Sequence, residues 1–315
     1  MKVRLARLWS FFPFVLCLLV WVAAVGWSAT LNRALADEAD VLPAYPGYQL
    51  VWHDEFDVDG PPNPDNWTAS NGGFERNHEL QWYQPDNVWV EGGHLVIEAR
   101  RERRASPMHD PTSEDWRRTR THIDYTSALV TSAGKQAFQY GRFEIRAKIR
   151  AEDGLWPAIW TLGVDGPWPA RGEIDIMEYY PGQILANAAW KKDQWRWSAN
   201  WDSTKTPIEE LGDPQTWDDD FHVWRMDWDE SFIRLYVDGR LLNEIDLSKT
   251  YNETPEANNP FRQPHFILLN LALGGDNGGD PSGTDFPSAY LVDYVRVYQP
   301  IDAKAVSSAG VASHE

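Results

Sequence analysis

The chain has 315 residues, with 29 basic and 47 acidic side chains, which gives a formal net charge of −18. Such an acidic surface repels nucleic acid and anionic lipid, and it weighs against sulfated polymers, which need a basic partner. The length beyond the first 36 residues fits one β-sandwich domain. The composition therefore favours a single globular domain and excludes a nucleic-acid-binding protein.

Residues 1–36 are predicted to form a secretory signal peptide. Three basic residues precede an apolar run from Leu8 to about Trp27, and the small-x-small sequence of residues 34–36 follows it. The run is also long enough for a retained N-terminal membrane anchor, although the small-x-small site favours cleavage. Removal takes away four basic residues and the single cysteine, Cys17, so the net charge falls to −22. We expect a secreted protein, extracellular or periplasmic, without disulfide bonds.

Residues 37–300 are predicted to form one domain of β-strands. Residues 140–149 alternate, with apolar Phe143 and Ile145 on one face and charged Glu144 and Arg146 on the other. Residues 238–239, Asp-Gly, join two apolar runs with the chemistry of a two-residue primed turn. Further strands are predicted at 94–100, 221–228, 266–273 and 290–298. Such strands without crossover helices indicate an all-β fold, an antiparallel β-sandwich or jelly roll.

Three less regular segments complete the domain. Residues 101–125 and 191–221 are predicted as long loops, and the second contains four tryptophans. Residues 301–315 are small and polar and are predicted to form a flexible tail. No internal repeat is present.

Three carboxylates stand among apolar, β-favouring residues in the sequence GEIDIMEYY, residues 172–180. Glu173 and Asp175 share one face of a strand, but a regular pleat sends Glu178 to the other face. One extra residue in a β-bulge at Ile176-Met177 returns Glu178 to the face of the other two, and bulges are common beside active sites. A solvated strand face, the alternative, does not account for the glycine before the strand or the Pro-Gly turn after it.

Two carboxyl groups that face one groove are the minimum equipment for glycoside hydrolysis. One protonates the leaving oxygen, and the other acts on the opposite side of the anomeric carbon. If both lie on one strand, we expect a separation of about 5–5.5 Å, which accompanies a covalent intermediate and retention. Asp175 between them disfavours ionisation of all three, so it helps to hold a proton on the acid and orients the nucleophile.

The segment GEIDIMEYY, with GLWPAIWTLG at 154–163 and Trp168-Pro169 before it, resembles glycoside hydrolase family 16 and its laminarinase-like endo-β-1,3-glucanases. The resemblance covers about residues 51–299. It implies a concanavalin-like, lectin-like jelly roll with a concave substrate cleft, no cofactor for catalysis, Glu173 as nucleophile, Asp175 as its assistant and Glu178 as general acid/base. The inserted methionine at 177 resembles the bulged subgroup that contains laminarinases and agarases.

Fifteen tryptophans remain beyond residue 36, and their flat faces suit stacking on sugar rings, with core packing as the alternative. The resemblance places several near the acids, together with polar residues that could hydrogen-bond sugar hydroxyls. The predicted substrate-binding residues are Trp156, Trp160, Trp168, Arg171, Trp190, Asn71, Gln81 and Asn270. Many laminarinases have a histidine shortly after the catalytic strand, where this chain has residues 187–190, Asn-Ala-Ala-Trp. Proton tuning or substrate preference is therefore expected to differ.

Asp293 shares strand parity with Val295 and Val297, so a carboxylate is predicted on an apolar face, where it needs a counter-charge. The resemblance implies a structural Ca²⁺ held by Asp293, Glu55 and the backbone of Gly93. Oxygen ligands from distant segments suit calcium. A salt bridge to Asp293 is the alternative.

The resemblance implies a monomeric, endo-acting enzyme that cleaves β-1,3-glucan with retention and has no nucleic-acid or protein partner. Agarose, porphyran and mixed-linkage β-glucan remain alternative substrates, because the loops that shape the subsites cannot be derived from sequence. A transglycosylase and a non-catalytic lectin-like binder are further alternatives. A pure binder, however, has no need of both Glu173 and Glu178.

Overall fold

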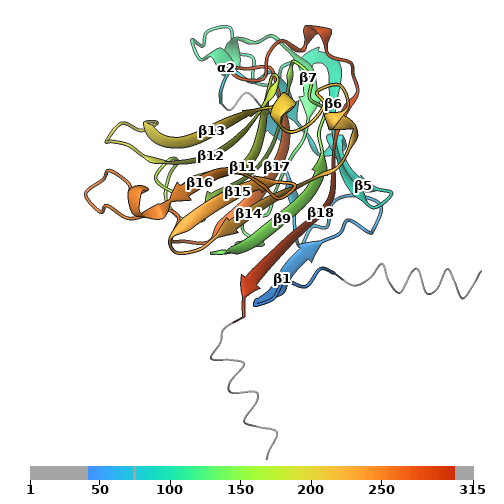
Figure 1. Cartoon of the computed structure of the whole chain (residues 1–315). Helices are drawn as coiled ribbons and strands as arrows, with labels where there is room; N and C mark the ends of the chain where they lie inside the picture. Colours follow the sequence, from blue (N-terminus) through green and yellow to red (C-terminus); the bar gives the residue numbers. More distant parts are fainter. Residues whose placement is uncertain (1–41, 74–75, 302–315) are drawn as a thin grey trace, which may run out of the picture. The chain divides into compact units, whose positions relative to one another are not determined.

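The computed structural model describes residues 42–73 and 76–301, and the body discussed below begins at Gly47 (Figure 1). The predicted signal peptide and almost all of the predicted C-terminal tail lie outside the described residues. No helix in the described part of the chain is long and apolar enough to span a membrane.

The body consists of two β-sheets, one of seven strands and one of eleven. The seven-stranded sheet has the order β13 (Ala199–Pro207), β12 (Gln183–Lys191), β11 (Glu173–Tyr180), β10 (Leu155–Gly163), β17 (His265–Leu273), β8 (Leu129–Thr131) and β2 (Thr68–Ala69). The larger sheet has the order β16 (Arg240–Asp246), β15 (Phe232–Val237), β14 (His222–Trp228), β9 (Gly141–Lys148), β18 (Ser288–Pro300), β6 (His94–Ala105), β7 (His122–Ser127), β4 (Gln81–Tyr83) and β3 (Gly72–Gly73). Two strands join it from the side: β1 (Tyr48–Asp54) pairs with β18 and β5 (Val88–Glu91) with β6.

Helical segments are short and connect the strands. They are α2 (Trp116–Thr119) and the 3₁₀ turns η1 (Pro85–Asn87), η2 (Ile208–Glu210), η3 (Trp217–Asp219), η4 (Leu247–Lys249) and η5 (Pro281–Gly283). All described strand pairs are antiparallel except β4 with β7. The predicted all-β antiparallel sandwich is therefore confirmed.

The alternating pattern of the strands explains how the two sheets pack. In β9, the apolar Phe143, Ile145 and Ala147 are fully buried, whereas Arg146 and Lys148 are only half-buried. These apolar residues join one large core cluster that also contains Ile174, on β11 of the other sheet. Each sheet thus buries its apolar face against the other, which is the main source of stability for a fold without disulfides.

The predicted turn at Asp238-Gly239 is confirmed. It joins β15 to β16, and both of its residues have positive φ angles, 47° and 82°. Two left-handed residues are what a primed hairpin turn requires, and Asp and Gly tolerate that conformation best.

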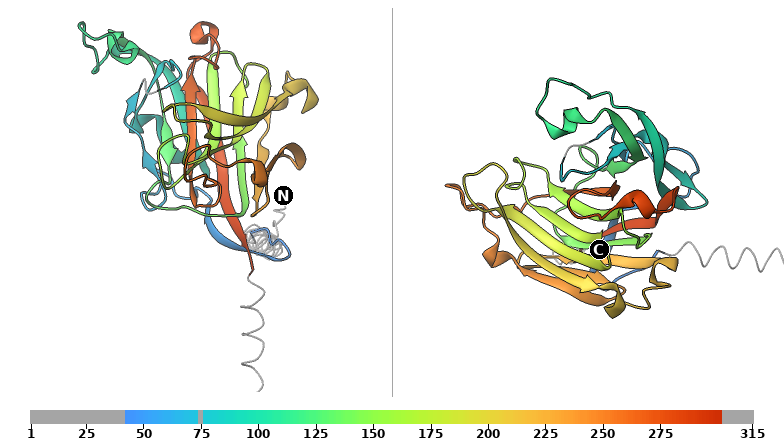
Figure 2. Two further views of the ribbon diagram at one scale, coloured as in Figure 1. Left: turned by 90° about the vertical axis from the view of Figure 1, so that its left-hand side faces the viewer. Right: turned by 90° about the horizontal axis from the view of Figure 1, so that it is seen from above.

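The two long loops predicted from sequence are partly wrong. Strand β6 continues to Ala105, and with α2 and β7 it forms an arm that projects from the sandwich (Figure 2, left, blue-green). The segment 191–221 contains β13, which forms the edge of the seven-stranded sheet. The part of β6 beyond Arg100 is charged, and β13 is largely polar on both faces, so hydrophobic periodicity could not reveal them.

Candidate active site

Strand β11 carries the three acids, and it has the predicted bulge. On one side, Asp175 pairs with Asn187 and Glu178 with Leu185, so Ile176 and Met177 together oppose one residue of β12. The pairing of β11 with β10 shifts at the same place. The extra residue brings Glu178 back to the face of Glu173 and Asp175, as the spacing of the sequence predicted.

Local sequence sets both ends of this strand. Gly172, just before it, has φ +78°, and a Cβ there would lie 3.0 Å from Pro260, so only glycine fits without strain. After the strand, Pro181 and Gly182 lead into β12, and Gly182 also has φ +78°, as a type II turn requires. The turn fixes the register of β11 against β12.

The three acids share the face of the seven-stranded sheet that points away from the core; we call it the catalytic face. Ile174 and Ile176, which alternate with the acids, are fully buried in the core between the sheets. Directly paired residues of neighbouring strands share a face. Trp160, which pairs with Asp175, therefore also belongs to the catalytic face.

Each glutamate accepts a hydrogen bond from a different tryptophan. Trp168 donates its Nε1–H to Glu173 Oε2 at 2.7 Å, and Trp156 donates to Glu178 Oε1 at 2.9 Å. The amide of Asn187 donates to Glu178 Oε2 at 3.0 Å and reaches Asp175 Oδ2 at 3.5 Å. The bonds leave each carboxyl group in one orientation, which is the preorganisation that catalysis requires.

Enclosure raises the pKa of all three acids. For Glu178, burial is the largest cause and the neighbouring Glu173 adds to it, while the bond from Trp156 opposes it, so its pKa rises to about 7. Burial and the charges of Glu173 and Glu178 raise the pKa of Asp175 well above its usual value. Burial also raises the pKa of Glu173, but Arg76, Trp168 and Asp175 all act to lower it. The same burial therefore acts on the three acids with different opposing contacts: three groups lower the pKa of Glu173, whereas both neighbouring glutamates raise that of Asp175.

These contacts suit each group to a chemical task. Asp175 keeps its proton and shares it in a hydrogen bond with Glu173, which favours the ionised form of Glu173. Glu178, with a pKa of about 7, can carry a proton at neutral pH and give it to a leaving oxygen. One ionised and one protonated carboxyl on one face are the pair that glycoside cleavage requires.

Of the four tryptophans predicted to bind substrate, Trp156 and Trp168 contact the acids directly. Trp160 lies on the catalytic face, but it is 7% exposed, donates to Asn270 Oδ1 at 2.7 Å and has the guanidinium of Arg76 5.1 Å from its ring. The prediction for Trp190 needs correction. It points into the core, where its ring meets Phe261, because its neighbour in sequence occupies the catalytic face.

The predicted polar residues serve mainly to hold the site together. Gln81 is buried, donates to Glu79 Oε2 at 2.7 Å and accepts from the backbone of Leu273. Asn270 accepts from Trp160 and donates to the hydroxyl of Tyr83 at 3.1 Å. Each amide thus makes one donor bond and one acceptor bond within the protein, which fixes its orientation.

Two other predicted residues lie nearer the surface. Asn71 is exposed and accepts from Trp82 Nε1 at 3.3 Å. Arg171 lies just before β11, where its guanidinium donates to the carbonyl of Val164 at 3.2 Å and lies over the ring of Phe266. Arg171 therefore bonds to the backbone in this structure instead of pairing with one of the acids.

Sequence reasoning did not place Asn187, Arg76 or Trp197 in the site. Asn187 could have been found by counting back from the Pro-Gly turn, because it pairs with Asp175 across the bulge. Arg76 lies in a loop, and Trp197 follows the β12 strand; its ring centroid is 6.1 Å from that of Trp168. No periodic signal marks residues in such segments.

The residues predicted to hold calcium do not fit a metal ion in this arrangement. Both carboxylate oxygens of Glu55 accept from Arg296, at 2.9 and 2.6 Å, and Asp293 Oδ2 accepts from Arg146 at 2.5 Å. Across residues 42–73 and 76–301, no group of three His, Cys, Asp or Glu side chains could hold a metal ion. Calcium binding, with Gly93 as a backbone ligand, stays a prediction.

The prediction that Asp293 lies on the apolar face of its strand is wrong. The ladder between β18 and β9 shifts between Val292 and Tyr294, so Asp293 is the extra residue of a bulge. The bulge leaves Asp293 half-buried beside Arg146, while Val295 and Val297 turn inward. The salt bridge that was the alternative to calcium is present.

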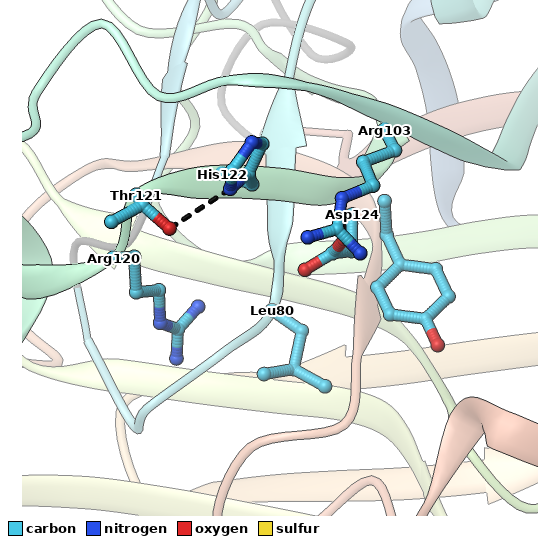
Figure 3. Close-up of a pocket in the computed structure, with 7 residues that line it drawn as sticks. Leu80, Arg103, Arg120, Thr121, His122 and Asp124 are labelled. Carbon is cyan, nitrogen blue, oxygen red and sulfur yellow. Dashed lines mark hydrogen bonds and ion pairs between the residues drawn. The ribbon is translucent and has the colours of Figure 1, made fainter.

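A hollow elsewhere on the surface contains none of the three acids (Figure 3). Arg103 approaches Asp124 at 3.7 Å, and Arg120 donates to the backbone carbonyl of Glu79 at 2.6 Å. His122 meets the hydroxyl of Thr121 at 2.8 Å. These groups are paired within the protein, and the hollow offers no pair of carboxylates for glycoside chemistry.

Comparison with known proteins identifies the family of the chain. The family model of glycosyl hydrolases family 16 matches residues 74–295. The chain is 33% identical over 281 residues to glucan endo-1,3-beta-glucosidase A1 of Niallia circulans, and 35% identical over 274 residues to a beta-glucanase of Rhodothermus marinus. Each match covers 82% of this chain, but it covers 39% of the first relative and 87% of the second.

Solved structures give the same result. The catalytic domain of an endo-1,3-beta-glucanase (laminarinase) from Thermotoga petrophila superimposes with a TM-score of 0.66 at 33% identity. The match covers 81% of this chain and 99% of that domain. The predicted family and fold are thereby confirmed: the chain belongs to glycosyl hydrolase family 16.

Proposed function

We propose that the protein is an endo-acting β-1,3-glucanase that cleaves its substrate with retention through a covalent glycosyl-enzyme. One observation carries the proposal: the bulge in β11 places Glu173, Asp175 and Glu178 on one face. The names of the relatives, glucan endo-1,3-beta-glucosidase and laminarinase, support β-1,3-glucan as the polymer.

In this mechanism, Glu173 attacks the anomeric carbon while Glu178 gives its proton to the leaving oxygen. The glycosyl group is then covalently bound to Glu173, and Glu178 is ionised. Water attacks the anomeric carbon and gives a proton to Glu178 while the bond to Glu173 breaks, which releases the sugar and returns both carboxyl groups to their starting forms. Asp175 acts through Glu173, because its hydrogen bond orients that carboxylate and lowers its pKa. Trp168 and Trp156 keep the two glutamates in place.

A reducing-sugar assay across laminarin, lichenan, agarose and porphyran tests the substrate. We expect the fastest release of reducing ends from laminarin, and slower release from the mixed-linkage lichenan. Faster cleavage of agarose or porphyran would assign the protein to a different polymer class. Product analysis with an oligosaccharide acceptor distinguishes hydrolysis from transglycosylation.

We also propose that the protein is exported. Support comes from the sequence of residues 1–36, with basic residues, an apolar run and a small-x-small site. N-terminal sequencing of the protein recovered from outside the cytoplasm tests this. A start at Asp37 is the expected result, whereas an intact N-terminus in the membrane fraction would indicate an anchor.

A further inference from the structure

Three tryptophans at the edge of the seven-stranded sheet are exposed to solvent. The exposed fractions are 79% for Trp195, 64% for Trp197 and 47% for Trp201, and no other tryptophan in the described residues is exposed to this degree. Indole rings are usually buried, because removing their apolar surface from water is favourable. Several exposed rings in one short segment mark an interaction surface.

The backbone that presents these rings is held by its own hydrogen bonds. Asp193 accepts from the backbone N–H of Trp195 at 2.7 Å and from the hydroxyl of Ser198 at 2.8 Å. The ammonium of Lys191 donates to the carbonyl of Trp195, and Ser198 N–H donates to the same carbonyl at 3.1 Å. A held turn loses less conformational entropy when a ligand binds, so its rings are ready to stack.

The exposed rings continue the catalytic face. Trp201 pairs with Ala189, and Ala189 pairs with Glu173, so all three share one face. Two strand spacings of about 4.8 Å separate Trp201 from the nucleophile's strand. Between them stands only the small side chain of Ala189.

Trp197 makes the second connection to the site. Its ring centroid lies 6.1 Å from that of Trp168, and Trp168 donates to Glu173. Trp168 and Trp197 therefore connect the nucleophile to the turn that carries the exposed rings, and the guanidinium of Arg196 lies 4.5 Å from the centroid of Trp197. Segment 192–201 exposes no large aliphatic side chain, and the charged Lys192 and Arg196 stand among its indoles.

We propose that Trp195, Trp197 and Trp201 bind further sugar rings of the same glucan chain, beyond the rings held next to the acids on the side of Glu173. The inference rests on the proposed function. Flat indoles stack on the apolar faces of pyranose rings, and the polar groups between them can hydrogen-bond hydroxyls. Long chains then gain binding that short ones cannot reach, so the surface sets the preference for substrate length.

The test compares a double variant, Trp195→Ala with Trp201→Ala, against the wild type on a series from laminaritriose to laminaripentadecaose and on laminarin. Leu241→Ala, which removes an exposed apolar side chain from the other sheet, is the matched control. We expect kcat/KM of the double variant to fall roughly tenfold on the long chains, the loss of about 1.4 kcal/mol of stacking. On the shortest substrates it should equal the wild type.

An equal loss on short and long substrates, or no loss on any, overturns the inference while the proposed function stands. Affinity electrophoresis in gels that contain laminarin, lichenan or agarose provides a readout independent of cleavage. If the wild type is retarded in these gels but cleaves none of the polysaccharides, and the double variant is not retarded, the binding surface is supported and the proposed function is contradicted. If the double variant differs from the wild type in sedimentation coefficient but is retarded equally, the tryptophans join two copies of the protein instead of binding sugar.

Discussion

The acids of β11 and the tryptophans of β13 and its turn lie on one side of the same sheet, yet they are built in opposite ways. Asp175 is buried, Glu173 and Glu178 are half-buried, and hydrogen bonds from neighbouring strands and loops hold all three. Trp195 and Trp197 leave most of their surface to water. Burial shifts the pKa values that proton transfer requires, whereas exposure leaves the indole faces open to stacking, so the proposed chemistry and the proposed binding surface lie on different strands.

The largest expected effect is on the enclosed side. Glu173→Gln and Glu178→Gln should each lower kcat on laminarin by roughly 10³-fold or more, because each removes the nucleophile or the proton donor. As a control, thermal unfolding followed by circular dichroism should show that both variants start from the folded state. Near-normal turnover in either variant means that the roles are assigned to the wrong residues.

The burial of Glu178 should lower the free energy of unfolding at alkaline pH. Its folded pKa, about 7, exceeds the usual 4.5, so the free energy of unfolding falls as pH rises through that interval. Above it the penalty is roughly 3–4 kcal/mol. Glu178→Gln should therefore be more stable than the wild type at pH 8 and close to it at pH 4.5, as measured by urea denaturation. An equal difference at both pH values contradicts a raised pKa.

The same pKa predicts how activity depends on pH. The protonated Glu178 is the active form, so kcat/KM should fall about tenfold per pH unit above about 7. Asn187→Ala removes a donor to the ionised carboxylate of Glu178, which raises its pKa further. The alkaline limb of the profile, where kcat/KM falls, should therefore move to higher pH. Matched pH profiles of the two proteins on laminarin measure the shift. A limb that does not move shows that Asn187 acts only through packing.

Replacement of Asp175 by an amide should lower kcat less than replacement by an apolar side chain. Because it is protonated and donates to Glu173, Asp175→Asn can keep that hydrogen bond, and we expect a loss of roughly tenfold in kcat. Asp175→Leu cannot keep it, so its loss should be larger by about another factor of ten. Equal losses in the two variants would indicate that Asp175 acts as a charge and not as a hydrogen-bond donor to Glu173.

The smallest effect is expected at the exposed edge. Trp201→Ala should lower kcat/KM on laminarin by only a few-fold, since one stacked ring contributes about 0.5–1.5 kcal/mol. Trp201→Phe, which keeps an aromatic face, should recover most of the activity. A loss as large as that of the glutamate variants would place Trp201 in the catalytic machinery and remove the contrast between the two regions.

The sequence predicted the enclosed region better than the edge. The bulge followed from the two-residue period of a strand, since Glu178 can join the other acids only if one residue is extra. Trp190 was misplaced because its face depends on the pairing of β12 with β11, which no local pattern reports. Strand β13 was missed because an edge strand with polar residues on both faces lacks alternation. The face of β18 on which Asp293 lies depends on a second bulge, and the spacing of the sequence did not reveal that bulge.

The most direct test of the central claim is to trap the covalent intermediate. A 2-deoxy-2-fluoro laminaribiosyl fluoride slows the release of the glycosyl group, so intact-protein mass spectrometry should show one added disaccharide. Peptide mapping should then locate it on Glu173. An adduct on another residue, or turnover of laminarin with inverted anomeric configuration by proton NMR and no adduct, would contradict the account.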